Sequence, residues 1–230
     1  MNATTPTAGP PSGPWLYWVL GFVGGYGDAA GFVLARTFTG HATGNLVLGA
    51  IEIAAGDLRS ALGHFSAVVA FLMGVFLGAW TMRSPNVSRF SSVITVELIL
   101  ILASPLLLSR HLAGTPSFVL CVSLALGLQN GAFRRAGGIS VHTTYLTGMI
   151  TSLISSQAEK YSAEPVPAAA SAYKAKTVLT VQIWTAFVLG AITAAAATFH
   201  FKQWAMLGIG LVLLLVILGS RFVITIPHRK

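Results

Sequence analysis

The sequence predicts an all-helical integral membrane protein with six long transmembrane helices, two short helices and a two-fold internal repeat. Of its 230 residues, 54% are hydrophobic and only 9% are charged, whereas a soluble domain carries about 25% charged residues. The apolar residues form long blocks, several of which reach the roughly 20 residues that a helix needs to cross a bilayer. Two stretches of the chain also repeat the same order of glycines and polar residues, which is the sign of an internal duplication.

Apolar blocks of two lengths define the expected elements. The short, more polar blocks lie at 40–53 and 141–156, and each is expected to be a re-entrant half-helix or a short, tilted span. Residues 157–176 form the longest hydrophilic connection and are predicted to be a loop with room for an interfacial helix. The blocks long enough to span a bilayer lie at 15–34, 62–82, 91–109, 116–133, 177–199 and 203–226.

The ends and the charges of the chain limit its organisation and its partners. Residues 1–14, rich in Pro, Thr and Gly, predict a disordered tail without a cleavable signal peptide, so that 15–230 form a single transmembrane domain. The formal net charge is +8, but the basic residues are scattered at the ends of apolar blocks. That distribution orients helices and meets anionic lipid headgroups. We therefore expect the lipid bilayer as a partner and exclude nucleic acid.

The internal repeat divides the domain into halves at roughly 15–109 and 116–226. Each half has a span with a glycine motif, a short block, a span with a Phe-x-x-Gly motif and a final span. The matched residues are Gly25 with Gly127, Asp28 with Asn130, His41 with His142, Thr43–Gly44 with Thr147–Gly148, and Ala70-Phe71-x-x-Gly74 with Ala186-Phe187-x-x-Gly190.

The distribution of basic residues predicts how the halves are related. If neither short block crosses the membrane, most basic residues fall on the side of both termini, as the positive-inside rule requires. Three spans per half then make the halves oppositely oriented, an architecture that recurs in transporters. On this arrangement the cytoplasmic side holds Arg83, Arg89, Arg134, Arg135, Lys160, Lys174, Lys176, Arg229 and Lys230, and the outer side holds Arg36, Arg59, Arg110 and Lys202.

The two motifs resemble those of the YoaK family of bacterial membrane proteins. The resemblance rests on the glycine-rich run 25–31 around Asp28, the triplet Thr43-Gly44-Asn45, and the second motif with Gly127-Leu128-Gln129-Asn130, Arg134-Arg135, Gly137-Gly138 and the run 140–148. It covers nearly the whole chain except the tail. It implies location in the bacterial cytoplasmic membrane, and it implies no particular activity or substrate.

Ionisable groups inside apolar blocks are the first candidates for function, because they are costly in a bilayer. Asp28 lies in the first long block among glycines, and its alternative role is a structural carboxylate that pairs with an arginine or caps a broken helix. Glu97 lies in the third long block and is a candidate for proton coupling; it would equally suit an ion pair with Arg134 or Arg135, or a place near a headgroup boundary.

The polar residues of the short blocks complete the candidate site. His41 and His142 would form a proton relay or a polar constriction with Asp28, or would be ordinary hydrogen-bonded histidines at the interface. The remaining candidates for a solute path are Thr43, Asn45, Asn130 and Thr147. Five glycines are candidates for close helix packing or hinges, namely Gly25, Gly27, Gly44, Gly127 and Gly148.

These features favour a small transporter or channel for a small polar or ionic solute. The alternative is a membrane scaffold or regulatory partner that transports nothing. The sequence has no nucleotide-binding loop, zinc-ligand spacing or nucleophile elbow, so we expect neither enzymatic activity nor a cofactor or metal. The glycine-rich faces would also suit a homo-oligomer.

Overall fold

A computed structural model of the chain describes residues 13–109, 114–136, 139–140, 143–144, 146–160 and 167–225. Within these ranges the predicted all-helical character is confirmed, with one addition: β1 and β2 are two-residue strands that pair antiparallel. The elements are α1 (Pro14–Ala35), α2 (Ala42–Ala54), α3 (Leu58–Thr81), α4 (Val87–Ser109), α5 (Gly114–Ala132), β1 (Arg135–Ala136), β2 (Ile139–Ser140), α6 (Leu146–Lys160), α7 (Pro167–Phe201), the 3-10 turn η1 (Lys202–Ala205) and α8 (Met206–Thr225).

Four helical stretches of the described chain are long and apolar enough to cross a membrane. They are Pro14–Ala35, Leu58–Thr81, Val87–Leu108 and Lys174–Ser220, the last of which contains most of both α7 and α8. The helix α5 has 19 residues but is not among them, since Gln129 and Asn130 near its end lower its hydropathy. The apolar helices indicate a membrane protein.

Local sequence explains where several helices begin. Pro14 opens α1, and proline suits the first turn because its missing N–H would have no helical partner. Asp57 caps α3 by accepting a hydrogen bond from the Ser60 N–H at 3.0 Å, so this helix begins ahead of the predicted start at 62. The segment 157–176, predicted as a loop with room for an interfacial helix, includes the beginning of α7 at Pro167, because a proline followed by an alanine-rich segment favours an early helix start.

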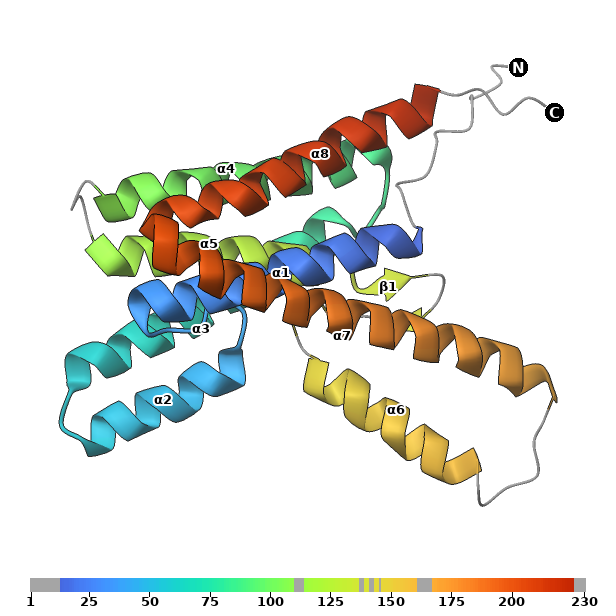
Figure 1. Cartoon of the computed structure of the whole chain (residues 1–230), viewed down its shortest axis with the longest axis horizontal. Coiled ribbons are helices and arrows are strands. Elements are labelled where there is room, and N and C mark those ends of the chain that lie inside the picture. The colour runs from blue at the N-terminus through green and yellow to red at the C-terminus, as the bar shows by residue number, and fades with distance from the viewer. Residues whose placement is uncertain are drawn as a thin grey trace.

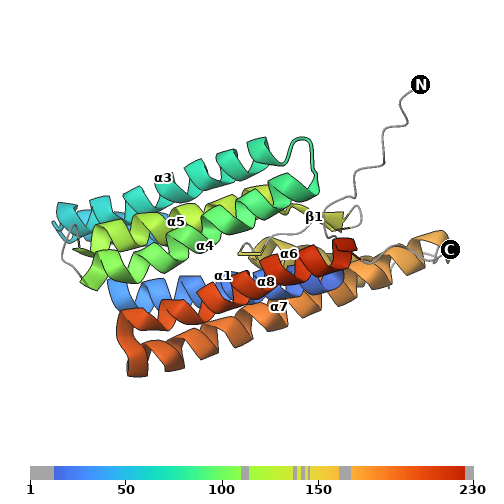
Figure 2. The same cartoon turned by 90° about the horizontal axis from the view of Figure 1, so that it is seen from above.

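Corresponding helices of the two sequence halves run in opposite directions (Figures 1 and 2). In both views α1, α4 and α7 run one way along the bundle, whereas α3, α5 and α8 run the other way. The start of α1 and the end of α8 therefore lie at the same end of the bundle, which we call the terminal end. At the other end, called the opposite end, α1 finishes and α3 and α5 begin.

The two short helices do not run the length of the bundle. In Figure 1, α2 and α6 each begin near its middle; α2 runs back to the opposite end and α6 to the terminal end. With 13 residues, α2 is about 20 Å long at 1.5 Å per residue. The chain thus leaves the opposite end after α1 and returns to that end along α2. It leaves the terminal end after α5 and returns to that end along α6.

Backbone contacts at glycines hold the long helices together. The most extensive helix pairs are α3 with α5 and α1 with α7. A Cβ on Gly25 would overlap the carbonyl oxygen of Phe187 on α7, and a Cβ on Gly127 would overlap the carbonyl oxygen of Phe71 on α3. Only glycine permits such an approach. The two contacts join residues that the sequence repeat matches, Gly25 with Gly127 and Phe71 with Phe187.

The outer faces of the long helices are apolar. Phe76 is 68% exposed and Phe199 is 73% exposed, and Leu62, Ile192 and Leu215 are exposed to a similar degree. Large apolar side chains exposed along whole helices would be unfavourable in water and suit contact with lipid. The polar side chains described next lie on the inward faces.

Candidate functional site

The Asp28 carboxylate organises the loop between α1 and α2. Its Oδ1 accepts hydrogen bonds from the backbone N–H groups of Thr39 at 2.9 Å and Gly40 at 2.8 Å. The hydroxyl of Thr39 donates to the carbonyl of Gly27 at 2.9 Å, which fastens the same turn to α1. Asp28 is 4% exposed, and these bonds to a charged acceptor offset the cost of burying it.

His41 contacts the second oxygen of the Asp28 carboxylate. Its Nδ1 is hydrogen-bonded to Oδ2 of the carboxylate. The ring lies between those of Phe38, at 5.6 Å, and Phe187, at 6.1 Å between centroids. Because Nδ1 is fixed on the carboxylate, Nε2 is the atom at which the ring can exchange a proton. The His41 side chain is 37% exposed, so water or a solute can reach it.

Asn45 fixes the other side of this loop. Its Oδ1 accepts from the Phe38 N–H at 3.0 Å, and its Nδ2 donates to the Phe38 carbonyl at 2.6 Å. The side chain thus pairs with both backbone groups of one residue, as a strand would. Asn45 is 2% exposed. Its role is to hold the loop, to which both its amide oxygen and its amide nitrogen are bonded.

The second half of the chain builds a similar turn from neutral groups. Asn130 accepts a hydrogen bond from the Thr143 N–H at 3.2 Å and donates to the Thr144 hydroxyl at 2.8 Å. Gln129 donates to the Thr143 hydroxyl at 2.7 Å and to the Leu20 carbonyl on α1 at 3.0 Å. This amide therefore links the second loop directly to the first helix.

These bonds favour a different alignment of the two motifs from the one that the sequence suggests. Thr39 and Thr143 both donate their N–H to the residue at the matched position, Asp28 or Asn130. Both also precede the first residue of a short helix by the same interval. This relation aligns Thr39 with Thr143. In that alignment the counterpart of position 142 is Phe38, whereas the sequence match paired His142 with His41. His142 itself lies outside the described residues.

The two loops meet between the halves of the bundle. A Cβ on Gly40 would lie 3.0 Å from Cγ2 of Thr144, and a Cβ on Gly24 would approach the carbonyl of Thr143 at 2.7 Å. Glycine at both positions lets the loops touch. We call the resulting set the central polar cluster: Asp28, Thr39, His41, Gln129, Asn130, Thr143 and Thr144.

A cavity of about 770 Å³ opens at the opposite end of the bundle. Ala35, Arg36 and Thr37 form part of its lining. These residues begin the same loop whose later part, Thr39 to His41, contacts Asp28. One short loop therefore lies between this cavity and the central polar cluster.

The other predicted residues have different surroundings. Thr43 and Thr147 are exposed on the first turns of α2 and α6, outside the cluster. Glu97 is fully buried, and neither of its oxygens has a hydrogen-bond partner among the described residues. The predicted pairing of Glu97 with Arg134 is absent there, since Arg134 is exposed; the side chain of Arg135 lies outside the description.

The predicted glycines differ in how tightly they are packed. Gly25 and Gly127 contact the backbone of another helix, as described above. A Cβ on Gly27 would lie 3.1 Å from Leu126, and one on Gly44 would lie 3.0 Å from the Phe38 ring. Gly148 is half-buried on α6.

Sequence reasoning missed several members of the site. Thr39, Gln129, Thr143 and Thr144 were not among the candidate site residues, although Gln129, Thr143 and Thr144 belong to the second motif. His64, which lines the cavity and is 4% exposed, also lies within a long apolar block. The rule that flagged Asp28, an ionisable group within a span, would have found His64 as well.

The cluster combines one ionisable pair with neutral hydrogen-bonding groups. Asp28 and His41 can share a proton, while the amides of α5 and the hydroxyls of the second loop hydrogen-bond to one another. Among the described residues no group of three or more His, Cys, Asp and Glu side chains could hold a metal ion.

The chain matches a known protein family and is similar to a bacterial transmembrane protein. The family model described as "Protein of unknown function (DUF1275)" matches residues 16–219. The UPF0700 transmembrane protein YoaK of Bacillus subtilis (strain 168) is 28% identical over 145 residues, which cover 60% of this chain and 64% of that protein. The chain therefore matches less than two thirds of this relative's length. No solved structure matches it.

Proposed function

We propose that this chain, which belongs to the family described as "Protein of unknown function (DUF1275)", is a small membrane transporter or channel for a small polar or ionic solute. The path would lie between the two halves, through the central polar cluster. The chain would act without enzymatic chemistry and without a cofactor. Its partners would be the lipid bilayer and the transported solute.

The contact between the two loops carries this proposal. Gly40 and Thr144 approach each other between the halves, and each loop precedes a short helix that begins near the middle of the bundle (Figure 1). Irregular backbone is tolerated at membrane depth only where protein or water satisfies it. Short helices that start at this depth beside buried polar groups are a recurring way to build a solute site.

The proposed topology has six spanning helices and two re-entrant ones. The spanning helices would be α1, α3, α4, α5, α7 and α8, with α2 and α6 re-entering from opposite sides. The opposite directions of matched helices (Figures 1 and 2) and the paired contacts of Gly25 and Gly127 support an inverted repeat. They do so independently of the charge distribution.

Basic residues orient this topology in the bacterial cytoplasmic membrane. Arg83, Arg89 and Arg134 belong to loops or helix ends at the terminal end, and Lys176 lies in the first third of α7, which begins at that end. Arg36, Arg59 and Lys202 belong to the opposite end. The positive-inside rule then assigns the terminal end, with both termini, to the cytoplasm. The cavity would open to the outside.

Solute flux into proteoliposomes tests the proposal. Purified protein would be reconstituted and screened with small ions, amines, carboxylates and neutral polyols, and with Asp28→Asn as the matched inactive variant. Saturable flux that falls at least tenfold in Asp28→Asn supports the proposed path. Flux unchanged by replacement of both Asp28 and Asn130 contradicts it, and a complete absence of flux favours the alternative of a non-transporting scaffold.

A further inference from the structure

The cavity at the opposite end has the construction of a binding site. Its polar residues, including Arg36, Glu52 and Arg59, line the mouth, because they stand at the ends of α1 and α2 and at the start of α3. One turn further into the bundle, Phe32, Leu48 and His64 line the inner part. A volume of about 770 Å³ falls within the range of small-molecule sites and exceeds the needs of a bare ion.

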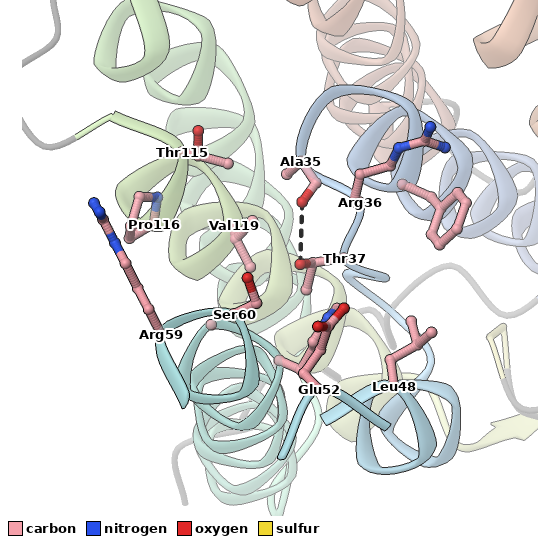
Figure 3. A pocket seen from close by; sticks show the side chains of 13 residues that line it. Ala35, Arg36, Thr37, Leu48, Glu52, Arg59, Ser60, Thr115, Pro116 and Val119 are labelled. Atoms are coloured by element: carbon pink, nitrogen blue, oxygen red, sulfur yellow. Dashed lines mark hydrogen bonds between the residues drawn. The ribbon is translucent and has the colours of Figure 1, made fainter. Parts of the chain in front are cut away.

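Glu52 is the one acidic residue among the described residues that line this cavity. Figure 3 shows its carboxylate in the middle of the view, whereas the guanidinium groups of Arg36 and Arg59 extend to opposite sides. Arg36 stacks over the Phe32 ring at 6.0 Å, and both arginines are exposed. Glu52 has no salt-bridge partner among the described residues, so its charge is available to a ligand.

Of the three hydroxyl residues in the described lining, Thr37, Ser60 and Thr115, the first two present acceptors. Ser60 donates its proton to Oδ2 of Asp57 at 2.7 Å, and Thr37 donates its proton to the carbonyl of Ala35 at 3.2 Å. A hydroxyl whose proton is used in this way offers only its oxygen lone pairs to a third group. A ligand in the cavity therefore meets the Glu52 carboxylate and two hydroxyl acceptors.

His64 provides a second, independent indication of a ligand. The residue is 4% exposed, yet its buried Nδ1 has no hydrogen-bond partner in the described structure. Buried polar atoms are rarely left unpaired. In the tautomer that carries its proton on Nε2, Nδ1 is one more acceptor.

From these contacts we infer that the cavity binds a small organic ammonium ion. Its N–H groups would donate to the Glu52 carboxylate and to the oxygens of Thr37 and Ser60, and its apolar part would lie against Leu48 and Val119. The guanidinium groups of Arg36 and Arg59 extend away from Glu52 on opposite sides (Figure 3), which weakens their repulsion of a cation bound there. The inference rests on the proposed function only in taking this ion as the transported solute; the binding site itself stands without it.

Titration calorimetry of the purified full-length protein in detergent tests the inference, with methylammonium chloride, sodium acetate and glycine as probes at constant ionic strength. We expect saturable binding of methylammonium and none of acetate. Glu52→Gln should raise the Kd for methylammonium about tenfold or more, because a hydrogen bond to a charged group is lost. Glu159→Gln also replaces an acidic residue, on α6, which contributes no residue to the cavity lining, and it should change the Kd less than twofold.

Gly63→Leu provides a second variant that does not depend on Glu52. Gly63 lines the cavity on α3, and nothing lies within 4 Å of a Cβ placed there. Leucine should therefore fill the cavity without disturbing the helix and abolish methylammonium binding. Unaltered circular dichroism and gel-filtration profiles would show that the variant is folded.

Three results would overturn the inference: saturable binding of acetate alone, a Kd for glycine at least tenfold below that of methylammonium and dependent on Arg59, or no saturable binding of any probe. The test separates binding from transport. Methylammonium that binds but is not transported would contradict the proposed function and leave the site intact. Methylammonium flux that is unaffected by Glu52→Gln would contradict the site and leave the proposed function intact.

Discussion

The carboxylate of Asp28 accepts a hydrogen bond from the backbone N–H of Gly40 at 2.8 Å, and this bond ties the middle of a long helix to the turn that starts a short one. With the bond from Thr39, it places a negative charge beside the N-terminus of α2. The partial positive charge of a helix N-terminus stabilises an anion there. A buried acid is thus used both to shape the loop and to position His41.

Replacement of Asp28 should separate these two roles. Asp28→Asn retains an oxygen for the two N–H groups but loses the charge that His41 contacts, so the free energy of unfolding should fall by only about 1–2 kcal/mol. Asp28→Ala leaves both N–H groups without a partner and should cost more, about 2–4 kcal/mol. Denaturation in detergent measures both values. Equal stability of the two variants would contradict the role of Asp28 in holding the loop.

Close helix contacts predict a specific pattern among glycine substitutions. Gly25→Ala and Gly127→Ala should each lower the free energy of unfolding by about 1–3 kcal/mol, because the added Cβ would overlap the carbonyl of Phe187 or Phe71. Gly63→Ala is the matched control, since a Cβ there meets nothing within 4 Å. It should stabilise the helix by about 0.5–1 kcal/mol. A control that destabilises as much as Gly25→Ala would contradict the packing.

Glu97 should behave differently from Asp28 although both are buried acids. Its oxygens have no partner among the described residues, so Glu97→Met removes a buried polar group and breaks no hydrogen bond. We expect the free energy of unfolding to stay the same or rise by up to about 2 kcal/mol. Thermal unfolding of this variant beside Asp28→Ala checks the contrast. A loss above about 2 kcal/mol would mean that Glu97 has a stabilising partner.

The sequence predicts the helices far better than the contacts between them. Long apolar blocks identify the main helices because a single property, length at high hydropathy, determines them. The start of α7 at Pro167 was missed, since polar residues in that segment suggested a loop while helix propensity decided the structure. The partners of Asp28 follow from the path of the loop through Thr39 and Gly40, which no local pattern specifies.

The candidate site, like the helix contacts, could be predicted only in part from the sequence. Asp28 stands out in the sequence because a charge in an apolar block is rare. Gln129 and Thr144 belong to residue types that are common in membrane helices, and only the approach of the second loop gives them a role. The alignment of the two motifs also depends on contacts within the fold. The hydrogen bonds of Asp28 and Asn130 align Thr39 with Thr143, whereas the sequence alone aligned His41 with His142.

Substituted-cysteine labelling in intact cells, with Cys121 first replaced, tests the central claim of inverted halves with re-entrant helices. Single cysteines at Ala35 and Ser60 flank α2, and single cysteines at Ala136 and Ala158 stand before α6 and near its end. We predict that a membrane-impermeant reagent labels both positions around α2 from outside and labels neither position around α6 until the cells are opened. Labelling of Ala35 and Ser60 from opposite sides would contradict the account, because α2 would then cross the membrane and the halves would be parallel.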